Sequence, residues 1–124
     1  MRKYRHKFAG RNSFMLFANF VQYALEDIEA NIANILQLRL LRHILGDCYE
    51  KKILPKVIHK PDKYRIELND AQAVAVALAL NNHRSEFLPE VENIILDGIL
   101  SELMRHLERN PEPIEYPQLP TPKN

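Results

Sequence analysis

The chain has 124 residues, which is enough for one hydrophobic core but too few for two. Hydrophobic residues make up 46% of it and charged residues 27%, the proportions of an ordinary soluble globular protein. A single cysteine, Cys48, excludes an internal disulfide and fits a reducing compartment such as the cytoplasm. The net charge of +1 by itself favours no particular class of partner.

The net charge hides two basic segments. Residues 1–25 carry five basic side chains and no acidic one, and residues 51–66 carry six basic side chains against Asp62 alone. Such segments are a mild indication of an anionic partner, here nucleic acid. The more common alternative is that they face water or lie against the protein's own acidic helices. The candidate nucleic-acid contacts are Arg2, Lys3, Arg5, Lys7, Lys56, Lys60, Lys63 and Arg65.

Residues 1–12 are expected to form a basic, flexible arm. Aromatic residues are interleaved among basic ones in its segment "RKYRHKF", residues 2–8, and six of the ten aromatic residues lie within the first 23. This pattern leaves three alternatives open: stacking on nucleic acid, lying on an anionic membrane surface, or packing into a core or a dimer partner. Asn19 and Gln22 interrupt the apolar stretch that follows, so we expect no secretion signal. No apolar run reaches the roughly 20 residues of a membrane span.

A long amphipathic helix is predicted to begin at Phe14, with Asn12 or Ser13 as its cap. Its apolar residues recur at helical spacing on one face. They are Phe14, Phe17, Val21, Ala24, Leu25, Ile28, Ile32, Ile35 and Leu36.

After residue 37 the apolar residues occupy the opposite face of this helix. A straight helix cannot bury one face and then the other among the same neighbours. Either it breaks near residues 36–38, or its second half inserts between two surfaces, one of them from a second copy. Gly46, followed by Asp47, is predicted to end it. The residues expected to mediate self-association are Leu38, Leu41, Leu45, Val74 and Leu78.

A short β-hairpin or a lone strand is predicted near residues 53–68. Tyr64, Ile66 and Leu68 alternate with polar residues, as in a half-buried strand, and "KPDK" at 60–63 is typical of a turn. The partner strand at 53–59 would be an edge strand, because a proline within it lacks a backbone donor.

Two further helices are predicted. Asn69 and Gln72 are spaced as a capping box, and the alanine-rich segment after them favours a short, buried helix over 70–81. The next helix has Pro89 in its first turn. Its apolar stripe consists of Val91, Ile94, Ile95, Ile99, Leu103 and Leu107. Residues 111–124 are rich in proline and are expected to be extended. Within them, "PQLP" at 117–120 matches the spacing that proline-recognition modules read.

No catalytic or metal-binding pattern is recognisable. The three glycines are isolated, so the usual phosphate-cradling loop is absent, and the five histidines are dispersed. Cys48 follows His43 by five residues, but a lone cysteine is more often structural than nucleophilic. We therefore expect neither a cofactor nor a small-molecule substrate, and no enzymatic activity.

These observations predict a mainly α-helical protein, a small bundle of about four helices with one short β element near 53–68 and an extended, proline-rich C-terminal tail. Its single helical domain would span residues 13–110. The first functional hypothesis is a non-catalytic, self-associating module for protein–protein interaction, acting as a homodimer in the cytoplasm.

The alternative is a nucleic-acid-binding regulator. Residues 63–104 give the order strand, short helix, polar turn, helix, which is similar to the ribbon–helix–helix repressors. In that family the strands of two copies pair and enter the major groove. The resemblance implies that Lys63, Arg65 and Glu67 face the bases and that the turn containing "HRSEF", residues 83–87, touches phosphate.

Overall fold

The computed structural model describes residues 3–31 and 36–109, and helices account for 75% of them. Arg2, Ile32, Ile35 and the predicted tail at 111–124 lie outside the described residues. The elements in chain order are β1 (Tyr4–Lys7), α1 (Arg11–Ala30), α2 (Leu36–Cys48), η1 (Tyr49–Ile53), α3 (Leu54–His59), β2 (Arg65–Leu68), α4 (Asp70–Asn82) and α5 (Glu90–Arg109). Because α2, η1 and α3 follow one another without a gap, these described residues form four helical segments and one two-stranded sheet, as predicted.

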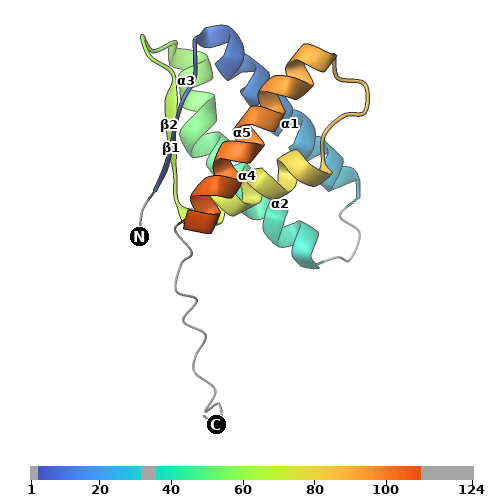
Figure 1. Cartoon of the computed structure of the whole chain (residues 1–124). Coiled ribbons are helices and arrows are strands. Elements are labelled where there is room, and N and C mark those ends of the chain that lie inside the picture. Colours follow the sequence, from blue (N-terminus) through green and yellow to red (C-terminus); the bar gives the residue numbers. More distant parts are fainter. Residues whose placement is uncertain (1–2, 32–35, 110–124) are drawn as a thin grey trace, which may run out of the picture.

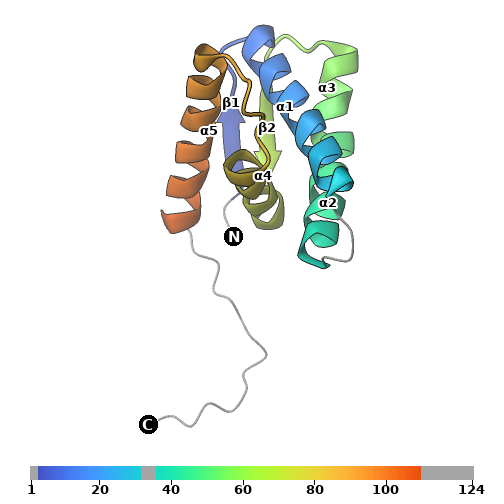
Figure 2. The same ribbon diagram turned by 90° about the vertical axis from the view of Figure 1, so that its right-hand side faces the viewer.

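The sheet lies at one edge of the molecule (Figure 1). Helix α4 lies between α5 and α2 and packs against both (Figure 2). Its alternating alanines let these neighbours approach closely, so seven of its residues are buried. The predicted capping box is present: the backbone N–H of Gln72 donates to the side chain of Asn69 over 2.8 Å, and the backbone N–H of Asn69 donates to the side chain of Gln72 over 3.0 Å.

Helix α1 contributes the aromatic part of the core. Its buried residues are Phe14, Phe17, Ala18, Phe20, Val21, Ala24 and Ile28. The helix begins at Arg11 with Gly10 as its N-cap, one turn before the predicted start at Phe14, because the backbone N–H of Phe14 already donates to the Gly10 carbonyl. It ends at Ala30, where the side chain of Asn31 donates to the Asp27 carbonyl over 2.8 Å.

The change of apolar face is therefore resolved by a break between α1 and α2, earlier than residues 36–38. Helix α2 is a separate helix that runs in a different direction from α1 (Figure 1), and its residues Leu41, Leu45 and Cys48 are buried in the core of the same chain. No second copy is needed to cover these residues. Leu36, which was assigned to the first stripe, is instead exposed.

The predicted stop at Gly46 and the predicted strand at 53–59 are both wrong, because the chain stays helical from Leu36 to His59. Pro55 lies in the first turn of α3, where a missing backbone donor is tolerated. Directly before α3, the five residues of η1 form a π-helix, in which the backbone N–H of Leu54 donates to the Tyr49 carbonyl. The helix ends at His59, because the next residue, Lys60, adopts a left-handed φ of 44° before Pro61.

The partner of β2 is the N-terminal segment that was expected to be a flexible arm. Strands β1 and β2 pair antiparallel, with Arg5 opposite Glu67 and Lys7 opposite Arg65. Tyr4 and Phe8 bury their rings in the core, which removes far more apolar surface from water than a free arm would. Of the three alternatives for the N-terminal aromatic residues, Tyr4 and Phe8 therefore follow the third, which is packing into the core.

Helix α5 buries most of the predicted stripe but not its beginning. Ile99 and Leu103 are in the core and Ile95 and Leu107 pack against it, whereas Val91 and Ile94 are exposed. Leu96, which was not assigned to the stripe, is also buried. The helix carries apolar residues on more than one face, and its contact with α4 selects the buried one.

Candidate nucleic-acid interface

Pairing of β1 with β2 unites the two basic segments of the sequence on one surface. Side chains alternate between the two faces of a strand, so burial of Tyr4, Ile66 and Leu68 turns their neighbours outward. The outward side chains are Arg5 and Lys7 on β1 and Arg65 and Glu67 on β2. Figure 1 shows the sheet at the edge of the molecule, with the helices on its inner side.

The helical segment next to the sheet completes this surface. Lys52 of η1 and Lys56 of α3 are four residues apart in a helical run, so they project on the same side. Together with the strands they enclose a hollow of about 550 Å³. It is lined by Arg5, His6, Lys7, Lys52, Lys56, Arg65, Ile66 and Glu67, and we call it the cationic hollow.

One carboxylate neutralises part of the cationic hollow. Lys3 Nζ lies 3.4 Å from Glu67 Oε1, and Arg5 Nε donates to Glu67 Oε2 over 2.9 Å. These two cations donate hydrogen bonds to the charged form of Glu67 and so hold the pKa of its carboxyl below its usual range.

The other four cations of the hollow have no such partner. Within the described part of the chain, no ion pair is made by Lys7, Lys52, Lys56 or Arg65. Like charges held close together repel one another, and an anion placed among them relieves that repulsion. The hollow is therefore suited electrostatically to an anionic group.

A polar cluster on the inner side fixes the position of β1. His6 Nδ1 lies 2.8 Å from Glu102 Oε2 on α5, and the hydroxyl of Tyr4 donates to the same oxygen over 3.1 Å. Burial, followed by the nearby Glu102 carboxylate, raises the pKa of Tyr4 far above its usual range, so the phenol stays neutral. At the other end of the sheet, Arg11 Nη1 donates to the Tyr64 hydroxyl over 2.8 Å. The outward cations are thus carried by an anchored strand.

Several of the residues predicted from the sequence meet here and others do not. Arg5, Lys7, Lys56 and Arg65 line the cationic hollow. Lys3 does not line it but forms an ion pair with Glu67, which does. Lys60 and Lys63 are exposed in the connection between α3 and β2 and do not line the hollow. Lys52 was not among the candidate contacts predicted from the sequence. Lys52 and Lys56 project on the same side only because residues 49–59 are helical, whereas the sequence predicts a strand at 53–59.

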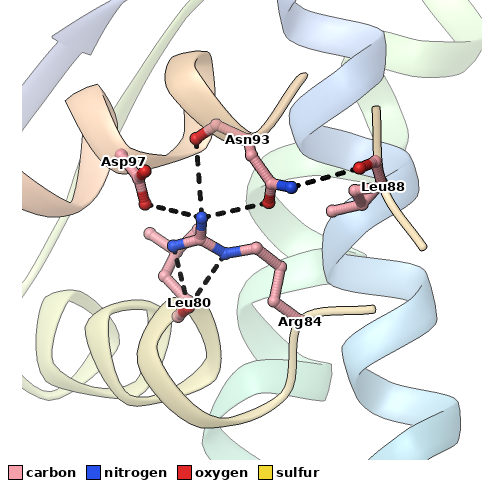
Figure 3. A network of polar contacts seen from close by, with 5 residues as sticks. All are labelled: Leu80, Arg84, Leu88, Asn93 and Asp97. Atoms are coloured by element: carbon pink, nitrogen blue, oxygen red, sulfur yellow. Dashed lines mark hydrogen bonds and ion pairs between the residues drawn. The ribbon is translucent and has the colours of Figure 1, made fainter. Parts of the chain in front are cut away.

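The ribbon–helix–helix resemblance holds for element order but not for its implied contacts. Strand β2 pairs with β1 of the same chain, whereas in that family it would pair with the strand of a second copy. In the turn that was expected to touch phosphate, His83 and Arg84 instead contact other residues of the same chain. His83 Nδ1 lies 2.8 Å from Asp27 Oδ2, and Arg84 donates to the Leu80 carbonyl, to Asn93 and to Asp97 (Figure 3).

The residues predicted for self-association separate into two groups. Leu41 and Leu45 are buried and Leu38 is partly buried in the chain's own core, so they offer little surface to a partner. Val74 and Leu78 are exposed on α4, where they line a hollow against α5.

Other site chemistry is limited in the part of the chain that the structure describes. Cys48 is buried, and burial raises the pKa of its thiol to about 11, which keeps the thiol protonated at neutral pH. Residues 3–31 and 36–109 contain no group of three or more His, Cys, Asp or Glu side chains that could hold a metal ion. Among the described helices, none combines the length and the apolar character that crossing a bilayer requires.

The fold and the site define a mainly helical domain with a cationic two-stranded edge. Comparison with known proteins adds no relative, since no protein-family model, no curated protein and no solved structure matches the chain significantly.

Proposed function

We propose that this protein binds nucleic acid through the cationic hollow and acts by binding, without catalysis. The observation that carries the proposal is the convergence of Lys7, Lys52, Lys56 and Arg65, from four elements, on one hollow without an ion pair in the described chain. Basic side chains that contact phosphates supply most of the sequence-independent affinity for nucleic acids.

The chemistry of the face favours phosphate contacts over base recognition. Phe8 and Tyr64, which are adjacent in sequence to Lys7 and Arg65, are buried, as is Tyr4, so these rings cannot stack on bases. Phosphate contacts position a protein on nucleic acid but carry no sequence information directly. We therefore expect binding that depends strongly on salt and weakly on sequence.

The number of free cations sets the expected salt dependence. If all four neutralise a phosphate, the slope of log K against log salt is about −0.9 × 4, or roughly −3.6, on duplex DNA. The measurement is fluorescence anisotropy of a labelled random duplex with the full chain, over a series of salt concentrations.

The test compares two charge reversals of equal size. Lys7→Glu with Arg65→Glu removes two cations of the hollow, and we expect this variant to lose measurable binding at moderate salt. Lys60→Glu with Lys63→Glu makes the same change in net charge on exposed residues outside the hollow, and we expect it to retain most of the affinity. Far-ultraviolet circular dichroism shows whether both variants are folded. Absence of binding by the wild type at low salt, or equal loss in the two variants, would contradict the proposal.

A further inference from the structure

A second surface lies on α4 and α5 and shares no residue with the cationic hollow. Val74 and Leu78 of α4 are 39% and 44% exposed, and Met104 of α5 is 46% exposed. With Leu100 and Leu107 they line a hollow of about 290 Å³, which we call the α4–α5 groove. The two helices that form it lie against each other in Figures 1 and 2.

The α4–α5 groove has no charged lining residue, and Asn81 is its one polar residue among the described lining. Asp70, at the first position, is the only charged residue of the 13 in α4. A surface helix normally carries charged residues on its exposed side, so an uncharged exposed stripe is poorly adapted to water.

The charge pattern selects the kind of partner. In a twofold-symmetric interface, residues near the axis meet their own copies, so a charged residue there would face a like charge. The uncharged stripe of α4 avoids this repulsion. Beside Met104 along α5, Arg105 and Glu108 carry opposite signs. Asp97, seven residues before Met104, is paired with Arg84, so these residues add no net charge that would oppose a second copy.

We propose that the α4–α5 groove is a homodimer interface in which Val74 and Leu78 of one copy pack against the same groove of the other. The small number of exposed apolar side chains predicts a weak dimer, with a dissociation constant in the micromolar range. This proposal is independent of nucleic-acid binding, and its test contains no nucleic acid.

The test is sedimentation equilibrium of the full chain from low micromolar to several hundred micromolar protein. We expect the mass to rise with concentration from the monomer value of 14.5 kDa toward twice that value. Leu78→Lys and Leu78→Glu place like charges at the twofold contact, so each variant alone is expected to weaken the dimer at least tenfold. An equimolar mixture of the two is expected to restore it, because opposite charges then meet.

Ile94→Lys is the matched control. Ile94 is an exposed apolar residue on α5 outside the groove, and its replacement should leave the dimer unchanged. A wild type that stays monomeric at every concentration overturns the proposal, whether residues 110–124 or another protein covers the groove. A dimer that persists in both Leu78 variants, or one that Ile94→Lys disrupts equally, also overturns it, since the interface would then lie elsewhere.

Discussion

Arg84 is the residue whose removal tests most directly how α4 is held to α5. Its side chain is only 16% exposed, and its guanidinium spans the two helices (Figure 3). Nε and Nη2 donate to the Leu80 carbonyl over 3.2 and 3.1 Å, and Nη1 donates to Asp97 Oδ1 over 2.6 Å. Leu80 lies in the last turn of α4, where carbonyls lack helical partners. Arg84 thus caps α4 while it contacts α5.

The expected cost of Arg84→Met follows from these contacts. Methionine keeps most of the aliphatic stem and removes the donors, so the loss reports hydrogen bonding more than packing. Hydrogen bonds from a charged donor to the Leu80 carbonyl contribute about 1.5 kcal/mol. The Asp97 side chain is 63% exposed, so its ion pair adds about 0.5 kcal/mol. We expect a total loss of about 2 kcal/mol in the free energy of unfolding.

The assay is urea unfolding followed by circular dichroism, with an unchanged m-value showing that the denatured state is unaffected. Asp97→Asn removes only the exposed ion pair and should cost about 0.5 kcal/mol. Arg105→Met makes the same replacement at an exposed position of α5 and should be nearly neutral. The reasoning is refuted if Arg84→Met costs less than about 0.5 kcal/mol, or if Asp97→Asn costs as much as Arg84→Met.

Three further predictions concern the hydrophobic core, the Cys48 thiol and the Glu67 carboxylate of the sheet. Leu45→Ala should lower the free energy of unfolding by about 3 kcal/mol, and Leu40→Ala, on the exposed side of the same helix, by less than about 0.5 kcal/mol in urea titrations. Cys48 should resist a thiol reagent in the native protein at pH 8 and react in urea, because burial keeps its pKa near 11; rapid native labelling would contradict this. The pKa of Glu67 is lowered in the folded state, so its pairing stabilises the fold at neutral pH and is lost as pH falls through that pKa. The stability difference between wild type and Glu67→Gln should therefore vanish in acid, and a difference that grows in acid would have the wrong sign.

Features encoded within a few residues could be predicted from the sequence. The capping box of Asn69 and Gln72, with the alanines after it, predicted α4 almost to the residue, because capping and helix propensity are local properties. The alternation of Tyr64, Ile66 and Leu68 predicted the strand and its buried face, because the period of two is intrinsic to extended chain.

The continuous helical run from Leu36 to His59 could not be predicted from the sequence, because it depends on tertiary packing. Gly46 and Pro55 are both typical helix-ending residues, yet the helical run passes through both. Burial of Leu45, Cys48 and Ile53 in the core stabilises this continuous helical run. Its backbone changes to the π-helix η1 directly before the segment that contains Pro55. Tertiary packing here outweighs local preference, as it often does when a helix buries a strongly apolar face.

The candidate site depended even more on the tertiary structure. The sequence by itself determined two separate basic segments and a strand within residues 63–68, which the structure forms at Arg65–Leu68. Only the fold decided that the strand pairs with Tyr4–Lys7, more than 50 residues away, and that Lys52 and Lys56 line the same hollow. Strand pairing is a long-range choice among competing partners, and no pattern within either segment specifies the other.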